Sequence, residues 1–196
     1  MKVSITAVQS AGHGLLVLAL ATVLGACTQI PGENASRAQA TVEPSYESGD
    51  IWEDWSDFSC PTDQFLIARW HSGEETGRTR YYCGKAFQFE AIPIRDHTTS
   101  GKISEDDGIR FVCPENQVMT GRRHDFDENG PTWYYCGTPY DYWGKPMQVV
   151  PEKEWIHIKN EQHTHTAACP ENMAMIGRWH LDDEQGPTEY LCARLF

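Results

Sequence analysis

The residues whose types could support chemistry lie in one pattern, Arg-x-His-x-x-x-Glu, which occurs three times in the chain. Arginine, imidazole and carboxylate groups can bind a polar ligand, transfer a proton or contribute to a metal site. Each copy also has a tryptophan in or near the pattern. The candidate ligand-binding residues are Arg69, Trp70, His71 and Glu75; Arg122, His124, Glu128 and Trp133; and Arg178, Trp179, His180 and Glu184.

Each copy lies in a segment that begins and ends with cysteine. The three segments are Cys60–Cys83, Cys113–Cys136 and Cys169–Cys192, which align without gaps. All three share Cys, Pro, Arg, His, Glu, Gly, Thr, Tyr and Cys at matching positions. The chain therefore has an internal threefold repeat.

The elements that must position the pattern are two strands in each repeat. In the first repeat we expect strands over 65–71 and 78–83, joined by the turn-rich SGEETG. Alternation then places Arg69 and His71 on one face of their strand. The sequence predicts an all-β fold of three tandem, disulfide-closed hairpin repeats with pseudo-threefold symmetry. We favour a β-trefoil-like arrangement of the three repeats, and the alternative is a looser stack of hairpins held by the disulfides.

The six repeat cysteines allow two regular pairings. Each repeat closes on itself, or the last cysteine of one repeat pairs with the first cysteine of the next. We favour closure within the repeat, which joins Cys60 to Cys83, Cys113 to Cys136 and Cys169 to Cys192. Each bond closes a loop that contributes about 3 kcal/mol in the chain-entropy model.

The seventh cysteine follows a hydrophobic leader. Lys2 precedes an apolar run, Leu15 to Leu24, which is too short for a permanent membrane span. The run ends in Leu-Gly-Ala-Cys27, which resembles a bacterial lipobox, and the resemblance implies acylation of Cys27, with palmitate among the acyl groups. Lipidation of Cys27 also leaves an even number of cysteines.

The leader and the repeats define the domain organisation. We expect a signal peptide over 1–26, a lipidated cysteine with a flexible tether over 27–46, and one β domain over 47–196. The three repeats are assigned to 47–95, 96–149 and 150–196. The expected location is the cell envelope, on the outer membrane where the host has two membranes and otherwise on the outer face of the cell membrane.

Charge narrows the class of partner. The formal net charge of the chain is −12, which argues against nucleic-acid binding and disfavours direct attraction to anionic lipid. We expect membrane contact through the lipid anchor only. A basic protein remains compatible with this charge.

Three interpretations of the repeated pattern stay open. In the first, the pattern makes the same structural contacts in each repeat. In the second, its residues form sugar-binding surfaces on which tryptophan rings act as platforms. In the third, its histidines and carboxylates contribute to metal binding. No further ligand position recurs beyond one His and one Glu, so no metal site is assigned. Phosphate-loop, nucleophile-elbow and HExxH motifs are missing. We therefore expect no catalytic residues and no cofactor.

The segments also resemble the dermatopontin repeat. The shared features are Cys-Pro, an apolar pair, an arginine or tyrosine on a strand that leads into the second cysteine, and an aromatic residue two positions before that cysteine. The resemblance implies an extracellular adhesion or carbohydrate-binding protein. The chain differs in its Gly-x-Thr-x-Tyr, where that family has Asp-Arg-x-Trp, and in a shorter cysteine spacing.

These observations favour a non-catalytic surface or periplasmic lipoprotein that binds glycans or a protein partner. One alternative is an inhibitor or immunity-type lipoprotein that binds a basic toxin or a basic wall-degrading enzyme. The other alternative is a hydrolase of envelope polymers.

Overall fold

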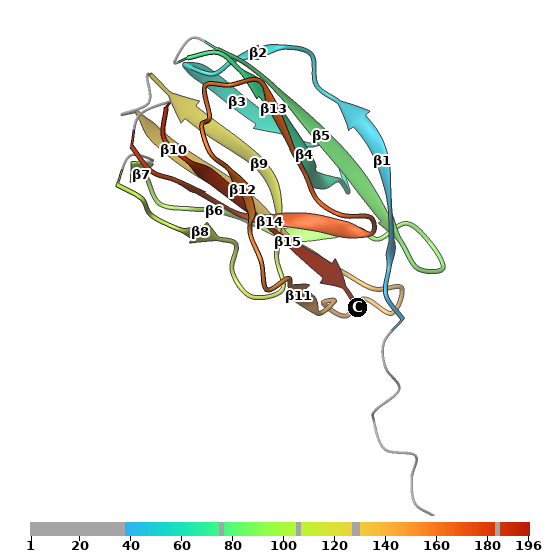
Figure 1. The fold of residues 1–196 in the computed structure, drawn as a ribbon. Coiled ribbons are helices and arrows are strands. Elements are labelled where there is room, and N and C mark those ends of the chain that lie inside the picture. Colours follow the sequence, from blue (N-terminus) through green and yellow to red (C-terminus); the bar gives the residue numbers. More distant parts are fainter. Residues whose placement is uncertain (1–37, 75–76, 105–106, 127–129, 183–184) are drawn as a thin grey trace, which may run out of the picture. The chain divides into compact units, whose positions relative to one another are not determined.

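The computed structural model describes residues 38–74, 77–104, 107–126, 130–182 and 185–196. These residues form fifteen strands in three antiparallel sheets and include no helix, so none of them offers a membrane-spanning helix (Figure 1). The predicted all-β, threefold fold is confirmed.

Each sheet is built on the hairpin of one repeat. The first sheet contains β1 (Thr41–Glu47), β2 (Ile51–Trp52), β5 (Arg78–Phe87), β4 (Phe65–Ser72) and β13 (His165–Ala168). The second contains β6 (Ile94–Thr99), β7 (Ile103–Ser104), β10 (Pro131–Pro139), β9 (Val118–Asp125) and β3 (Trp55–Ser59). The third contains β11 (Val149–Pro151), β12 (Ile156–Ile158), β15 (Thr188–Leu195), β14 (Met173–His180) and β8 (Phe111–Val112).

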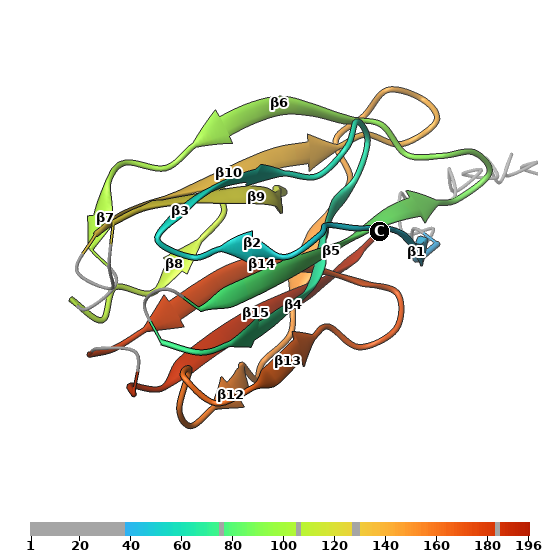
Figure 2. The ribbon, with the colours of Figure 1, turned by 90° about the horizontal axis from the view of Figure 1, so that it is seen from above.

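The repeats exchange one strand around the threefold arrangement. The strand before the first cysteine of each repeat pairs with the hairpin of another repeat: β3 with β9, β8 with β14, and β13 with β4. Figure 2 shows β6, β10, β9 and β3 side by side in the sheet completed in this way. In place of one closed barrel shared by the repeats, the structure therefore has three separate sheets that are linked cyclically.

The folded domain begins before residue 47. The segment expected to be a tether contains β1, because Thr41–Glu47 forms an antiparallel edge of the first sheet against β5. Most β1 side chains are exposed, so the segment carries no hydrophobic periodicity. Its backbone pairing with a distant strand could not be seen in the local composition.

The three disulfides join the cysteines within each repeat, as predicted. Each bond lies where the chain leaves one sheet and enters the next. The amide of each first cysteine also donates to a carbonyl of another repeat: Cys60 to Thr120, Cys113 to Ile176, and Cys169 to Ile67. The bonds therefore fix the crossover strands as well as the hairpins.

Two clusters of buried apolar side chains fill the space among the sheets. One cluster includes Phe65, Val118 and Ile176. The other includes Cys83, Cys113 and Cys136 together with Tyr81, Tyr134 and Tyr190. Alternation along the central strands directs these side chains inward, together with the repeated arginines and histidines.

Candidate functional site

The repeated arginines and histidines lie in the interior. Arg69, Arg122 and Arg178 are each only 2% exposed, and the three histidines of the pattern are also buried. Their strands β4, β9 and β14 alternate, so the intervening residue of each pattern faces outward. A ligand from solvent does not reach these inward side chains, and the geometry favours the structural interpretation of the pattern.

Two glutamates outside the pattern balance these buried cations. Arg69 Nη2 lies 3.1 Å from Glu53 Oε2, and Arg69 Nη1 lies 2.5 Å from Glu161 Oε1. Arg122 is paired with Glu53, while Arg178 Nη2 lies 2.7 Å from both oxygens of Glu161. Removing either carboxylate would leave guanidinium charge in the interior, which is strongly unfavourable.

Tyrosine hydroxyls connect the repeats in a ring around this ion cluster. Arg69 of the first repeat donates to Tyr190 Oη of the third at 2.8 Å. Arg178 of the third lies 3.3 Å from Tyr134 Oη of the second, and Arg122 of the second lies 3.4 Å from Tyr81 Oη of the first. The shared tyrosine of the repeat is therefore part of the interface between repeats.

Electrostatics holds the cluster in its charged form. Burial alone would raise the pKa of Glu53, but Arg122 and Arg69 outweigh it and hold that pKa far below the usual range. Arg178 and Arg69 do the same for the pKa of Glu161, again against burial. Burial, followed by the charge of Arg69, lowers the pKa of His71 to about 4. His71 is thus neutral at pH 7.

The pattern's three glutamates, Glu75, Glu128 and Glu184, lie outside the described residues. Within the described part of the chain, no cluster of three or more His, Cys, Asp or Glu side chains could hold a metal ion. Sequence reasoning missed Glu53 and Glu161 because both lie in the divergent leading half of a repeat. The signal that was available is a glutamate two or three residues after an isoleucine, which recurs as Ile51/Glu53, Ile103/Glu105 and Ile158/Glu161.

The three candidate tryptophans lie on the outer faces of the sheets, each half-buried beneath an arginine. Arg80 lies 4.9 Å from Trp70, Arg123 lies 4.9 Å from Trp133, and Arg110 lies 4.7 Å from Trp179, measured from Cζ to the ring centroid. Each arginine also pairs with a carboxylate, respectively Asp50, Asp125 and Glu189.

In the second repeat, the arginine and the tryptophan of the stacked pair have exchanged strands relative to the first repeat. Trp70 faces Arg80 across β4 and β5, whereas Arg123 on β9 faces Trp133 on β10. This exchange explains why Arg123 occupies the position that holds tryptophan in the other repeats. The stacks stabilise the outer faces by cation–π attraction and partly cover the rings.

An open, polar groove lies beside the second of these stacks, between the first and second repeats. The first repeat contributes the segment 59–64, and the second contributes β6 and parts of β9 and β10. Side chains with hydrogen-bonding capacity line it, among them Asp57, Asp63, Gln64, His97, Thr98, Thr99 and Tyr135. We call this the outer groove.

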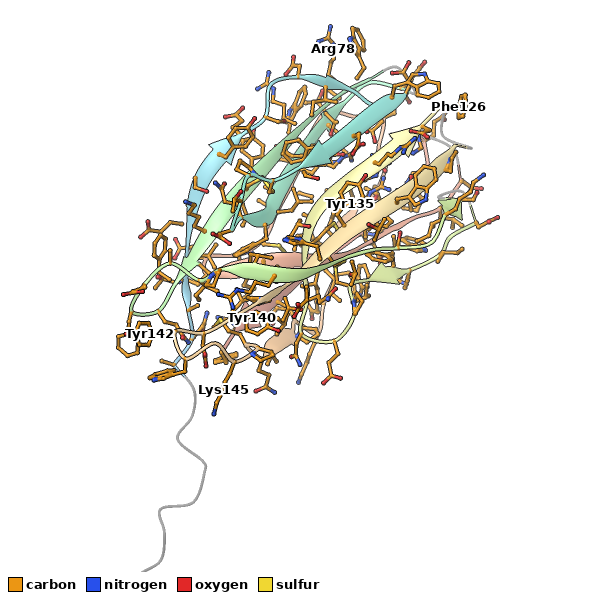
Figure 3. The ribbon with its side chains drawn as sticks, turned by 180° about the vertical axis from the view of Figure 1, so that it is seen from behind. Arg78, Phe126, Tyr135, Tyr140, Tyr142 and Lys145 are labelled. Carbon is orange, nitrogen blue, oxygen red and sulfur yellow. A yellow bond between two sulfur atoms is a disulfide. The ribbon has the colours of Figure 1, made fainter. Side chains whose placement is uncertain are left out.

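One side-chain pair organises the outer groove. Tyr135 on β10 donates from its hydroxyl to Asp57 Oδ1 on β3 at 2.9 Å. Burial and this hydrogen bond raise the pKa of Tyr135 to about 12. The ring lies on the outer face between the two ends of the domain (Figure 3). The groove therefore has an oriented phenol next to a carboxylate.

The pair is not repeated. The positions equivalent to Tyr135 hold Tyr82 and Leu191, and those equivalent to Asp57 hold Arg110 and Thr166. The buried arginines, histidines and tyrosines are the same in all three repeats, since each solves the same packing problem. The outer groove differs because its side chains are not constrained by that packing, and no repeated motif could have indicated it.

Comparison with known proteins identifies no relative: no family model, no curated protein and no solved structure matches the chain. The likeness to the dermatopontin repeat stays a prediction.

Proposed function

We propose that this protein is a non-catalytic, lipid-anchored protein of the cell envelope that binds a glycan in the outer groove. The observation that carries the proposal is the groove itself, which is open and is lined by carboxylates, hydroxyls, an amide and an imidazole, with Tyr135 among the lining residues. Sugar hydroxyls donate and accept hydrogen bonds, and this lining offers both kinds of partner.

The Asp57–Tyr135 pair is suited to fix the orientation of a sugar. The carboxylate of Asp57 can accept from two neighbouring hydroxyls, and Tyr135 offers an apolar ring edge beside its hydroxyl. Trp133 and Arg123 lie on the adjoining outer face, since Arg123 is the cross-strand neighbour of both Asp57 and Trp133. A glycan longer than one residue could extend over this stack.

The location rests on two kinds of support. Three disulfides are typical of a protein in an oxidising compartment outside the cytoplasm. The Leu-Gly-Ala-Cys27 sequence supports removal of residues 1–26 as a signal peptide and lipidation of Cys27, with an acyl anchor in the outer membrane or on the outer face of the cell membrane.

The test is a glycan array with the purified full chain, followed by calorimetric titration of the best ligand. Asp57→Asn and Tyr135→Phe should each weaken binding by about 10-fold to 100-fold, because each removes a hydrogen bond at a charged group. Both side chains face outward, so thermal stability should change little.

Tyr82→Phe is the matched control, because Tyr82 occupies the equivalent position of the first repeat. That variant should bind like the parent protein. The proposal fails if no glycan binds, or if a glycan binds equally well to both groove variants. Co-purification of a basic protein together with an empty array would instead support the inhibitor-type alternative.

A further inference from the structure

The three most exposed large hydrophobic side chains of the described residues lie together. Phe89, Trp143 and Tyr142 are 80%, 68% and 61% exposed. The ring centroids of Phe89 and Trp143 are 6.1 Å apart, and those of Tyr142 and Trp143 are 5.8 Å apart, both in edge-on arrangements. We call these three residues the aromatic tip. Clustered exposed rings of this kind mark an interaction surface.

A tight turn over residues 141–145 holds two residues of the aromatic tip in place. In the turn 141–145, the Asp141 amide donates to the Lys145 carbonyl, the Lys145 amide donates to Asp141 Oδ1, and the Gly144 amide donates to the Asp141 carbonyl. Gly144 has a φ of 73°, which a glycine adopts without strain. Tyr142 and Trp143 are thus displayed at the apex of an ordered turn, next to Phe89 of the β5–β6 loop.

The aromatic tip lies at the end of the domain where the described chain begins. Gln88 Nε2 donates to the Ala38 carbonyl at 2.8 Å, and the Ala40 amide donates to the Leu195 carbonyl at 2.8 Å. Figure 1 shows the start of β1 and the C-terminus at this end. Tyr142 and Lys145 lie here, and Arg78 and Phe126 lie at the opposite end (Figure 3).

The distance along the chain from Cys27 to this end is short. Ten residues separate Cys27 from Ala38. Fully extended, that segment reaches about 35–40 Å, and a coil of the same length spans about 18 Å. An acyl chain on Cys27 would therefore keep the bilayer surface within reach of the aromatic tip.

We propose that the aromatic tip docks into the headgroup region of the bilayer that carries the Cys27 anchor, an inference that rests on the lipid-anchored location proposed above. This contact would add to the lipid anchor, which the sequence led us to expect as the only membrane contact. Tryptophan and tyrosine concentrate at this depth of a membrane because their rings are apolar and their polar atoms stay hydrated. The nearby charges, Glu90, Asp141 and Lys145, have both signs, so the contact depends on the rings rather than on anionic lipid.

This docking sets the orientation of the domain. The end that carries Trp55 and Phe126, whose ring centroids are 4.4 Å apart, points away from the membrane. The outer groove with Tyr135 opens on the outer face between the two ends. The anchor alone would leave the domain free to rotate. The contact of the aromatic tip with the bilayer would hold the outer groove at a constant distance from the membrane surface.

The test uses the full chain purified with its anchor and reconstituted into phosphatidylethanolamine–phosphatidylglycerol vesicles that contain lipids brominated on the acyl chains. Bromine quenches the fluorescence of tryptophans that reach the bilayer. Trp143→Ser should abolish most of the quenching seen in the parent protein. Trp55→Ser, at the opposite end and similarly exposed, should leave the quenched intensity unchanged.

Equal quenching in the two variants would overturn the docking. Near-ultraviolet circular dichroism of both variants establishes that the fold is retained. Mass spectrometry of the N-terminal peptide determines separately whether Cys27 is acylated. An acylated Cys27 without quenching at Trp143 rejects the docking and keeps the anchor. Quenching at Trp143 with an unmodified Cys27 keeps the aromatic tip as a membrane contact and rejects the anchor.

Discussion

Arg69 Nη1 and Glu161 Oε1 lie 2.5 Å apart in the interior, although the two residues are 92 positions apart in the chain. The pair joins the first repeat to the third and thereby closes the cyclic arrangement. Arg69 also lies 3.1 Å from Glu53 of its own repeat, so its guanidinium connects the two buried carboxylates. The buried arginines of the pattern that suggested a ligand site thus connect the repeats.

Glu161→Gln should reduce the free energy of unfolding by about 3–5 kcal/mol, because it removes the carboxylate from buried Arg69 and Arg178. Urea denaturation followed by tryptophan fluorescence measures the effect. Glu43→Gln, a change of the same chemistry at an exposed position, should alter stability by less than about 0.5 kcal/mol. Equal stability of the two variants would refute a structural role for the cluster.

Stability should fall as the solution is acidified. The pKa of His71 is about 4 in the folded protein and about 6.5 in the unfolded chain, so the unfolded chain takes up its proton first. From about pH 6.5 down to about pH 4, this group lowers the free energy of unfolding by up to ~1.4 kcal/mol per pH unit. Glu53 and Glu161, whose pKa values are depressed, add further loss below about pH 4.5.

Denaturation curves recorded between pH 7.5 and pH 4 check this dependence. His71→Gln should flatten the part of the curve between pH 6.5 and pH 4.5, although His165 contributes in the same direction because burial lowers its pKa as well. A parent protein whose stability is constant over this range would contradict the pKa assignments.

Gly121→Ala should destabilise the domain by about 1–3 kcal/mol or more. A Cβ at this position would lie 2.2 Å from the Phe58 carbonyl oxygen, a backbone atom of the exchanged strand β3. The two strands would have to separate. Gly101→Ala is the control, because nothing lies within 4 Å of its Cβ position. Thermal melts of both variants measure the difference, and identical melting temperatures would argue against the close approach of β3 to β9.

Replacing both Cys113 and Cys136 by alanine should cost about 2–5 kcal/mol, since their disulfide closes a loop and fixes the entry of β8 into the third sheet. Chemical denaturation gives the loss. Cys27→Ser should leave the stability of the domain unchanged, because Cys27 is not part of the three disulfides. A loss of similar size on Cys27→Ser would mean that this cysteine takes part in folding.

The threefold repeat, the hairpins and the disulfide pairing were predictable because their signals are local. Cys60 and Cys83 bound one hairpin, and its alternation puts Arg69 and His71 on one face. The same alternation could not tell which face points inward, because the repeat offers an arginine and a histidine on one side and a tryptophan on the other. Which face points inward depends on residues far away in the chain, such as Glu161, which pairs with Arg69.

The amino-acid sequence by itself determined that this protein has three disulfide-closed β-hairpins with one shared pattern. Only the tertiary structure decided that the arginines and histidines of the pattern are buried, because the carboxylates that balance them, Glu53 and Glu161, lie outside the Cys-to-Cys segments. It also decided the strand exchange and the outer groove, since both arise where two repeats meet. Local residue patterns specify strands and turns, whereas contacts between distant strands depend on how the sheets assemble.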